Sequence, residues 1–166
     1  MATKQSKKIS GKHIKRNPAF ALFIAIIVIL IDQATKALVG GMVTSGDQIA
    51  PLPFLNIATT WNYGVSFGLG NDAAQDQMPI ALLSLMIVVA LWMLILKQRY
   101  MSKLNQSAIA MIIGGALSNL IDRWNYGAVM DFLDFHIMGY HWPAFNVADS
   151  AIVVGVIIWL IFTKDT

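Results

Sequence analysis

The chain contains no cysteine among its 166 residues, which excludes disulfide bonds, thiolate nucleophiles and thiolate metal sites. It also contains no glutamate, so all nine acidic residues are aspartates, whose short side chains suit a fixed site better than a solvated face. Charged residues make up only 13% of the chain, whereas a soluble domain averages about a quarter. Because 57% of the residues are hydrophobic, we expect an integral membrane protein with one domain.

Positive charge is concentrated at the start of the chain. Six of the twelve lysine and arginine residues lie within residues 1–19, and we assign 1–17 to a basic tail. Such a tail can bind nucleic acid. An apolar run follows it directly, which favours an orientation signal with some attraction to anionic membrane lipids, and no nucleic-acid partner is expected.

Four apolar runs predict transmembrane helices within a membrane domain that covers 18–166. They lie at about 18–39, 79–96, 104–121 and 146–162. The first run could be a secretory signal peptide, but no convincing cleavage site follows it, so we expect a retained span. The third run is less apolar and contains two glycines, and small residues of this kind would let a neighbouring helix approach closely.

The basic residues between the runs predict the orientation. The tail and the linker 97–105 together carry nine lysines and arginines, whereas the loop 40–78 carries none and the loop 122–145 carries only Arg123. The positive-inside rule then places both termini in the cytoplasm and both long loops outside. Alternating and β-branched residues with proline and glycine in the first loop predict short strands. The expected fold is therefore all-α and polytopic, with four transmembrane helices and a small β-containing external region.

Polar residues gather at the external end of three of these spans. Asp32 and Lys36 are four residues apart on the first span, so they share a helix face. The others are Asn119 and Asp122 on the third span, Asn146 and Asp149 on the fourth, and Asp131 and Asp134 in the loop between them. Ionisable residues within a membrane usually face a bundle interior or a cavity. The sequence therefore predicts a polar pocket near the outer surface.

Each of these residues also has a structural interpretation. Asp32 and Lys36 could form a self-neutralising ion pair, which is the favoured reading for them. Asp149 could be an acid in the first turn of a helix capped by Asn146. Asp122 and Arg123 could form a helix-end pair, and the asparagines could join helices by hydrogen bonds. The combination of Asp131 with Asp149 nevertheless favours a functional site.

Metal and serine chemistry find less support. His136 and His141 lie near two aspartates, but their spacing is not a strong zinc pattern and no H-E-x-x-H occurs. Lys36 could serve Ser118 as a base, although nothing in the spacing favours it. We expect neither a metal nor another cofactor.

Four separated motifs follow one another in the same order as in a known family. They are "DQATK" (32–36), "WNYGVSFGL" (61–69), "GGALSNLIDRWNYGAVMDF" (114–132) and "HWPAFNVADSAI" (141–152). Together they resemble the bacterial lipoprotein signal peptidases, also called type II signal peptidases. The resemblance covers almost everything from Asp32 to Ile152, and the basic tail lies outside it.

The resemblance implies an aspartic endopeptidase of the bacterial inner membrane, with its active site near the periplasmic face. Such enzymes remove the signal peptide from prolipoproteins with a diacylglyceryl-modified lipobox cysteine, cleaving just before that cysteine. Surrounding membrane lipids and globomycin-type inhibitors are further expected partners. The matching positions are Asp131 and Asp149 as catalytic residues, Asn119, Asp122, Arg123 and Asn146 as supporting residues, Asp32 and Lys36 as structural residues, and Asn62 and Gly64 as loop residues that touch substrate.

Two neighbouring carboxylates can supply both a base that activates water and an acid that protonates the leaving nitrogen. A proton-coupled transporter or channel subunit is the alternative, because intramembrane Asp and Lys residues suit one equally well. A purely structural membrane subunit is a second alternative. Transporters more often show internal repeats and midplane sites, whereas here no repeat is visible and the acids lie toward one end.

Overall fold

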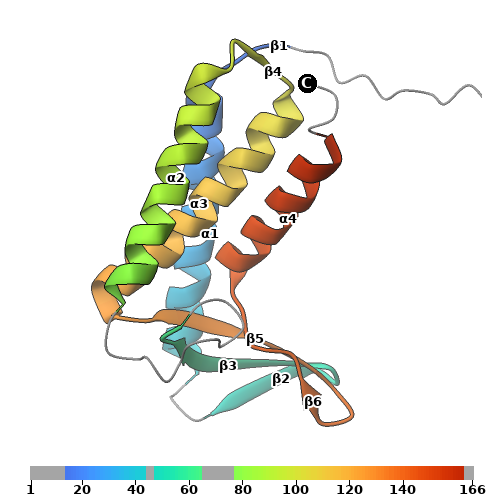
Figure 1. Cartoon of the computed structure of the whole chain (residues 1–166). Coiled ribbons are helices and arrows are strands. Elements are labelled where there is room, and N and C mark those ends of the chain that lie inside the picture. Colours follow the sequence, from blue (N-terminus) through green and yellow to red (C-terminus); the bar gives the residue numbers. More distant parts are fainter. Residues whose placement is uncertain (1–13, 44–46, 65–76, 163–166) are drawn as a thin grey trace, which may run out of the picture.

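The computed structural model describes residues 14–43, 47–64 and 77–162, so most of the basic tail lies outside the described residues. Four helices stand over a small antiparallel sheet (Figure 1). The helices are α1 (Pro18–Met42), α2 (Met78–Lys97), α3 (Lys103–Tyr126) and α4 (Val147–Phe162). Among them, α1, α2 and α3 are long and apolar enough to cross a membrane, and α4 is apolar but has 16 residues.

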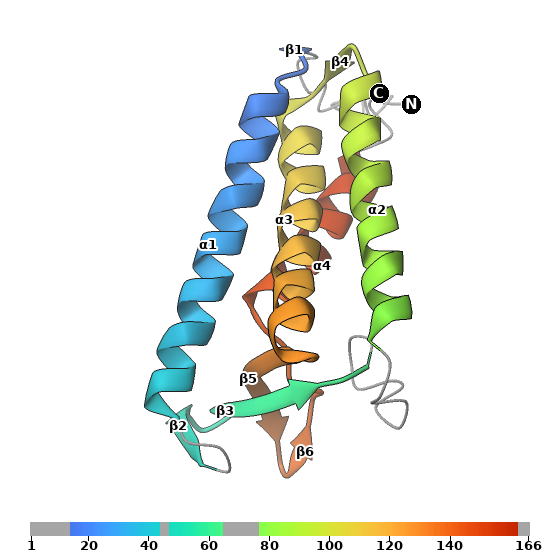
Figure 2. The same ribbon diagram turned by 90° about the vertical axis from the view of Figure 1, so that its left-hand side faces the viewer.

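Helix α3 is the centre of the bundle, with α1, α2 and α4 around it (Figure 2). Its most apolar window is 61% buried, compared with 17% for α1 and 11% for α2. Gly114 on α3 packs against α1, where an added Cβ would lie 2.7 Å from the carbonyl oxygen of Ala25. The adjacent Gly115 packs in the same way against the carbonyl of Ala148 on α4. The predicted close approach of neighbouring helices to the third run is confirmed.

Helix α3 also extends past the predicted end of its span, so residues 122–126 are helical and not part of a loop. Asp122 and Arg123 continue the helix because their side chains find polar partners inside the protein. The helix ends at Gly127, which adopts a left-handed conformation with φ 69° and donates its N–H to the carbonyl of Arg123.

The sheet contains the strands β2 (Gln48–Leu52), β3 (Leu55–Asn62), β5 (Val129–Ile137) and β6 (Tyr140–His141), in the order β2-β3-β5-β6. The prediction of strands in the first long loop is confirmed by β2 and β3. The second long loop supplies β5 and β6, which pairs β3 with β5 in an antiparallel register that sets Thr60 opposite Asp131. Met138 and Gly139, both with positive φ, make the tight turn between β5 and β6.

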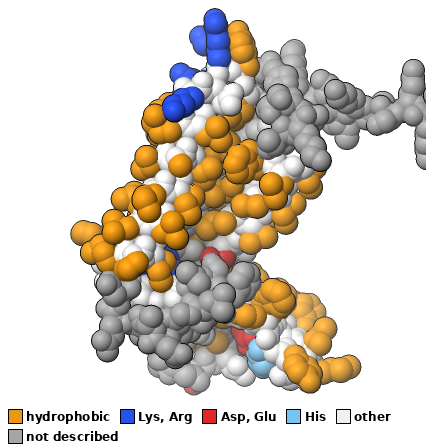
Figure 3. All heavy atoms as spheres, viewed as in Figure 1, with side chains coloured by type: hydrophobic (Ala, Val, Ile, Leu, Met, Phe, Trp, Pro, Cys, Tyr) orange, Lys and Arg blue, Asp and Glu red, His pale blue; other side chains and the backbone are white. Residues whose placement is uncertain are grey.

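At the other end of the bundle, β1 (Ile14–Lys15) pairs antiparallel with β4 (Tyr100–Met101). Most of the lysine and arginine surface visible in Figure 3 lies at this end, opposite the four-stranded sheet. Between the two ends, large apolar side chains cover the outer surface of the helices (Figure 3). This distribution is that of a protein whose helices face lipid.

Candidate active site

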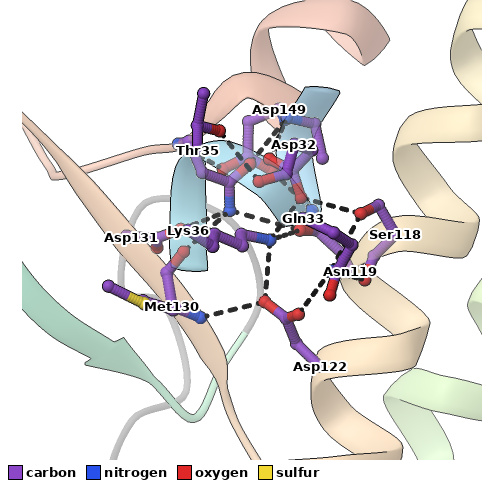
Figure 4. Close-up of polar contacts among 12 residues, drawn as sticks. Asp32, Gln33, Thr35, Lys36, Ser118, Asn119, Asp122, Met130, Asp131 and Asp149 are labelled. Atoms are coloured by element: carbon purple, nitrogen blue, oxygen red, sulfur yellow. Dashed lines mark hydrogen bonds and ion pairs between the residues drawn. The ribbon is translucent and has the colours of Figure 1, made fainter. Parts of the chain in front are cut away.

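Polar side chains from α1, α3, β5 and the start of α4 meet where the helices reach the sheet (Figure 4). They are the predicted residues Asp32, Lys36, Asn119, Asp122, Asp131, Asn146 and Asp149, together with Gln33 and Ser118. The structure therefore brings together the residues that the sequence placed at one depth, with the exception of Asp134.

Lys36 is the buried cation of this cluster. Its Nζ lies 2.6 Å from Asp32 Oδ2 and 2.7 Å from Asp122 Oδ2, and it donates a hydrogen bond to Asn119 Oδ1 at 3.2 Å. These three partners use all three ammonium donors, which removes most of the cost of burying the charge. The expected pair of Asp32 and Lys36 is thus present, but Asp122 joins it in place of forming a pair with Arg123.

Asp32 ties α1 to both neighbouring helices. Its Oδ2 accepts a hydrogen bond from the hydroxyl of Ser118 on α3 at 2.7 Å, and its Oδ1 accepts one from the backbone N–H of Ala148 on α4 at 2.8 Å. Gln33 donates to Ser118 Oγ and to Asp122 Oδ1. Ser118 is therefore engaged with Asp32 and Gln33, and its described bonds do not include Lys36, which speaks against a Ser–Lys pair.

Sequence reasoning missed Gln33 as a member of this cluster. It lies within the first motif, directly after Asp32, and the motif itself was the available signal. Because successive residues of a helix point about 100° apart, the position next to Asp32 did not indicate that both side chains face α3.

Asp131 lies on β5 with a side chain that is almost fully buried, at 2% exposure. Its Oδ1 accepts a hydrogen bond from Asn146 Nδ2 at 2.7 Å, and its Oδ2 accepts one from Asn62 Nδ2 at 3.0 Å. Asn62 reaches it from β3 because the two positions lie on the same face of the paired strands.

Asp149 lies in the first turn of α4 and is half-buried. Its Oδ1 accepts a hydrogen bond from Asn119 Nδ2 at 2.9 Å, and its Oδ2 accepts one from the backbone N–H of Asn146 at 3.2 Å. The backbone N–H of Asp149 in turn donates to Asn146 Oδ1 at 2.9 Å. The structural interpretation of Asp149 as an acid beside the cap of its helix is therefore confirmed. The same capping residue, Asn146, also binds Asp131, so the capping role of Asp149 is compatible with a shared site.

Asn146 connects the two aspartates. Its side-chain amide donates to Asp131, and its backbone amide donates to Asp149. The same side-chain amide also lies within hydrogen-bonding distance of Asn119 Oδ1, at 3.2 Å, and of the carbonyl of Met130, at 3.3 Å. One fully buried asparagine therefore fixes two carboxyl groups that come from different elements.

The environment of Asp131 favours its protonated form. Burial raises the pKa of Asp131 to about 7, and the negative charge of Asp149 acts in the same direction. The hydrogen bonds from Asn62 and Asn146 oppose this shift without cancelling it. A carboxyl group that holds a proton near neutral pH beside a second carboxyl group is suited to general acid–base catalysis.

Arg123 and Gly64 lie at the edge of the site. The Nη2 of Arg123 donates to the carbonyl of Gly64 at 3.1 Å, and Nη1 reaches the carbonyl of Asn119 at 3.4 Å. Gly64 donates its N–H to Asn62 Oδ1 at 3.0 Å. Arg123 thus holds the end of β3 against α3, and through it the asparagine that contacts Asp131.

Asp134 lies outside this cluster although it is three residues from Asp131. Side chains alternate along a strand, so the two aspartates point to opposite faces of β5. Asp134 accepts a hydrogen bond from Asn56 and lies 2.8 Å from His141 Nδ1, and the His141 ring stacks on His136. No group of three or more His, Asp, Glu or Cys residues among the described positions has an arrangement that could hold a metal ion.

An apolar groove of about 380 Å³ leads from the outside to Asp149. Its walls come from the segment before α4, including Trp142 and Phe145, and from Ile152 and Val153 on α4. Figure 3 shows the corresponding notch between the helices and the sheet, with acidic side chains visible at its inner end. The groove therefore joins an apolar surface to one of the two linked carboxyl groups.

Comparisons with known proteins agree in one family. The family model described as signal peptidase (SPase) II matches residues 24–164. A lipoprotein signal peptidase of Francisella tularensis subsp. novicida (strain U112) is 42% identical over 153 residues, which cover 89% of this chain and 95% of the relative. One of Paraburkholderia phymatum is 42% identical over 135 residues, covering 81% of each chain.

Two solved structures have the same fold. A bacterial membrane enzyme determined by the in meso method at 2.3 Å has a TM-score of 0.81 and 34% identity, with coverage of 92% of this chain and 93% of the other. A second, at 1.9 Å, has a TM-score of 0.78 and 35% identity, with coverage of 93% and 99%.

Proposed function

The chain belongs to the signal peptidase II family, peptidases that process lipoproteins, and on this premise we propose that it is an intramembrane aspartic endopeptidase. Its substrates are prolipoproteins with a diacylglyceryl-modified cysteine, and it cleaves just before that cysteine. Asp131 and Asp149 are the catalytic residues. The observation that carries the proposal is that Asn146 donates hydrogen bonds to both of these carboxyl groups.

The two aspartates divide the chemistry of amide hydrolysis between them. The pair shares one proton, because two neighbouring carboxyl groups that are largely removed from water resist ionising together. The ionised member takes a proton from a water molecule, and the resulting hydroxide attacks the scissile carbonyl carbon. The protonated member donates a hydrogen bond to the developing oxyanion and then transfers its proton to the leaving nitrogen as the C–N bond breaks.

The remaining site residues position this pair. Asn62, Asn119 and Asn146 each hold one or two carboxylate oxygens by hydrogen bonds. Arg123 fixes the loop position Gly64, which in turn fixes Asn62. We assign Asn62 to the support of Asp131, while Gly64 borders the expected path of the substrate.

The ion cluster around Lys36 has a structural role in this proposal. Asp32 and Asp122 bind Lys36 and also backbone N–H groups of α4 and β5, at Ala148 and Met130. The cluster thereby fixes the positions of α4 and β5 along the axis of the bundle relative to α1 and α3. Helix α4 and strand β5 carry the catalytic pair.

The four helices make four spans of one membrane domain in the inner membrane, with both termini in the cytoplasm and the sheet at the periplasmic face. The concentration of Lys and Arg at the end opposite the sheet supports this orientation. Helix α4 covers about 24 Å with its 16 residues, which is less than the roughly 30 Å of the hydrocarbon core. It starts at the catalytic pair, so a helix that reaches the cytoplasmic side of the hydrocarbon core places the pair in the outer part of that core, below its outer edge.

The groove beside Asp149 supports a lipid-bearing substrate. Its walls are apolar, and the substrate must present both a membrane-spanning signal helix and acyl chains at the cleavage site. We assign the groove to these parts of the prolipoprotein, and globomycin-type inhibitors compete for the same surface. The proposed chemistry requires no metal or other cofactor.

The test uses the purified full chain in lipid with a diacylglyceryl-modified prolipoprotein, and measures release of the signal peptide. Asp131→Asn and Asp149→Asn are each expected to lower the rate about 100-fold or more. Asp134→Asn is the matched control, because this aspartate lies on the same strand but outside the site. Chelating agents are expected to leave the rate unchanged.

A proton-coupled transporter predicts no peptide release by the unaltered chain. A merely structural role of the two aspartates predicts that their variants lose thermal stability rather than activity. Full activity of either Asn variant would refute the assignment of that residue to the chemistry.

A further inference from the structure

A second charged feature lies at the end of the bundle opposite the catalytic pair. Four basic side chains line one hollow of about 390 Å³: Lys15, Arg16, Lys97 and Arg99. Pro18 and Leu96 complete its wall. These cations come from two segments that are about 80 residues apart in sequence, the entry to α1 and the end of α2 with the linker that follows it.

The two segments are held together by several bonds. The strand pair sets Lys15 opposite Tyr100, and the backbone N–H of Arg16 donates to the carbonyl of Arg99 at 3.3 Å. Gln106 on α3 is fully buried and binds both segments, since its Oε1 accepts the N–H of Asn17 at 2.8 Å and its Nε2 donates to the carbonyl of Met101 at 3.1 Å. The cations therefore converge on fixed backbone.

These four charges have no carboxylate partner within 4 Å in the described part of the chain. Arg16 donates to the carbonyl of Ile95 at 3.4 Å, and Arg99 lies over the ring of Tyr100 at 5.7 Å. Neither contact neutralises a charge. The positive-inside rule depends on the number of basic residues and not on their convergence around a hollow, so orientation alone does not account for this arrangement.

The surroundings of the hollow indicate what kind of anion it receives. Leu96 forms part of its wall and is 37% exposed, and Met93 and Leu22 expose further apolar surface on α2 and α1. This surface belongs to the lipid-facing belt of the helices. A ligand that fits both the basic hollow and the apolar surface beside it has an anionic head and apolar chains.

We propose that this hollow binds the phosphate headgroup of an anionic glycerophospholipid from the cytoplasmic leaflet. Basic pockets between transmembrane helices on the cytoplasmic side recognise such headgroups. The lipid bridges the entry to α1 and the α2–α3 linker and offsets the repulsion among the four cations. The site is separate from the catalytic pair and independent of its chemistry.

The test is native mass spectrometry of the purified full chain in a neutral detergent, with dioleoylphosphatidylglycerol or dioleoylphosphatidylcholine added. The unaltered chain is expected to retain the anionic lipid preferentially. Each removed charge is expected to weaken its retention about fivefold, so that the variant K15Q/R16Q/K97Q/R99Q no longer prefers it. K97Q/R99Q removes only two exposed side chains and serves if the fourfold variant does not fold.

The matched control is K4Q/K7Q/K8Q/K12Q, which removes four charges from the tail and keeps Lys15, Arg16, Lys97 and Arg99. Equal weakening in the control would refute the proposal, because binding would then follow net charge alone. Equal retention of the two lipids by the unaltered chain would also refute it. If millimolar inorganic phosphate displaced the lipid, the ligand of the hollow would be a free anion and not a lipid headgroup, which would also overturn the proposal. Asp131→Asn is expected to bind the lipid normally, which keeps this result independent of catalysis.

Discussion

Asn146 and Asp149 bind each other twice at the start of α4. The side-chain oxygen of Asn146 accepts the N–H of Asp149 at 2.9 Å, and a carboxylate oxygen of Asp149 accepts the N–H of Asn146 at 3.2 Å. This reciprocal pattern is a capping box with Asn and Asp in its two positions. Because the Asn146 amide also binds Asp131 at 2.7 Å, the residue that caps the helix also holds both members of the proposed catalytic pair.

The double role of Asn146 can be separated by substitution. Asn146→Ser keeps an oxygen that can cap α4 but loses the donor to Asp131. We expect its thermal stability to fall by less than that of Asn146→Ala, which also loses the cap at a cost of about 1 kcal/mol. Both variants are expected to lose roughly 100-fold in rate, because the carboxyl group of Asp131 is no longer positioned.

Thermal unfolding in detergent and signal-peptide release from the same preparations provide the two measurements. A Ser variant with unaltered activity would show that the Nδ2 donor of Asn146 is dispensable. Asn105→Ser is the control, since this buried asparagine lies in the first turn of α3, at the end of that helix opposite the candidate site.

The pH dependence of catalysis follows from the raised pKa of Asp131, about 7, which results from burial and from the charge of Asp149. The shared proton is present below this pH and is lost as the pH rises through it. We therefore expect kcat/KM for peptide release to fall above about pH 7. Asn62 donates to Asp131 and favours its ionised form, so Asn62→Ala should move this decline to higher pH.

Asn56→Ala is the matched control for Asn62→Ala, because Asn56 also lies on β3 but donates to Asp134. Its pH profile should coincide with that of the unaltered chain. A decline that moves to lower pH in Asn62→Ala would contradict the assigned direction.

The buried ammonium of Lys36 predicts a large effect on stability. Lys36→Met leaves Asp32 and Asp122 buried as neighbouring acids with no cation between them. Breaking a buried ion pair in this way costs about 3–5 kcal/mol, so we expect a much lower unfolding temperature and less protein in the membrane. Adding Asp122→Asn should restore part of the loss, whereas the exposed Lys97→Met should have little effect. Unaltered stability of Lys36→Met would refute the structural role of the cluster.

The close contact between α1 and α3 predicts opposite results for two glycine substitutions. At Gly114 a Cβ would lie 2.7 Å from a backbone oxygen of α1, so Gly114→Ala is expected to cost about 1–3 kcal/mol. At Gly41 nothing lies within 4 Å, and Gly41→Ala is expected to be neutral or to stabilise α1 by up to about 1 kcal/mol. Thermal unfolding of the two variants measures the difference, and equal effects would contradict the packing described.

Apolar runs in the sequence predicted where each helix lies to within a few residues, except at the end of α3. There the helix continues to Tyr126, past the last residue of the apolar run, because Asp122 is satisfied by Lys36 and Gln33. Hydrophobicity measures how favourably a residue transfers into lipid, and it carries no information about a polar partner on another helix.

The sequence predicted the members of the candidate site more completely than the hydrogen bonds between them. The depth argument and the motifs identified Asp131 and Asp149, but the pairing of β3 with β5 decides that Asn62 reaches Asp131. Such pairing depends on contacts between residues about 70 positions apart, which periodicity within one segment does not record. The convergence of Arg16 and Arg99 was missed for the same reason.

The three bonds of Lys36 have a consequence for biosynthesis. Asp122 enters the membrane on a helix whose own arginine is directed to the carbonyls of Gly64 and Asn119. Its neutralising cation sits on α1, which the ribosome completes well before α3. Burial of Asp122 beside its neutralising cation therefore requires contact between α1 and α3, although chain order places α2 between them.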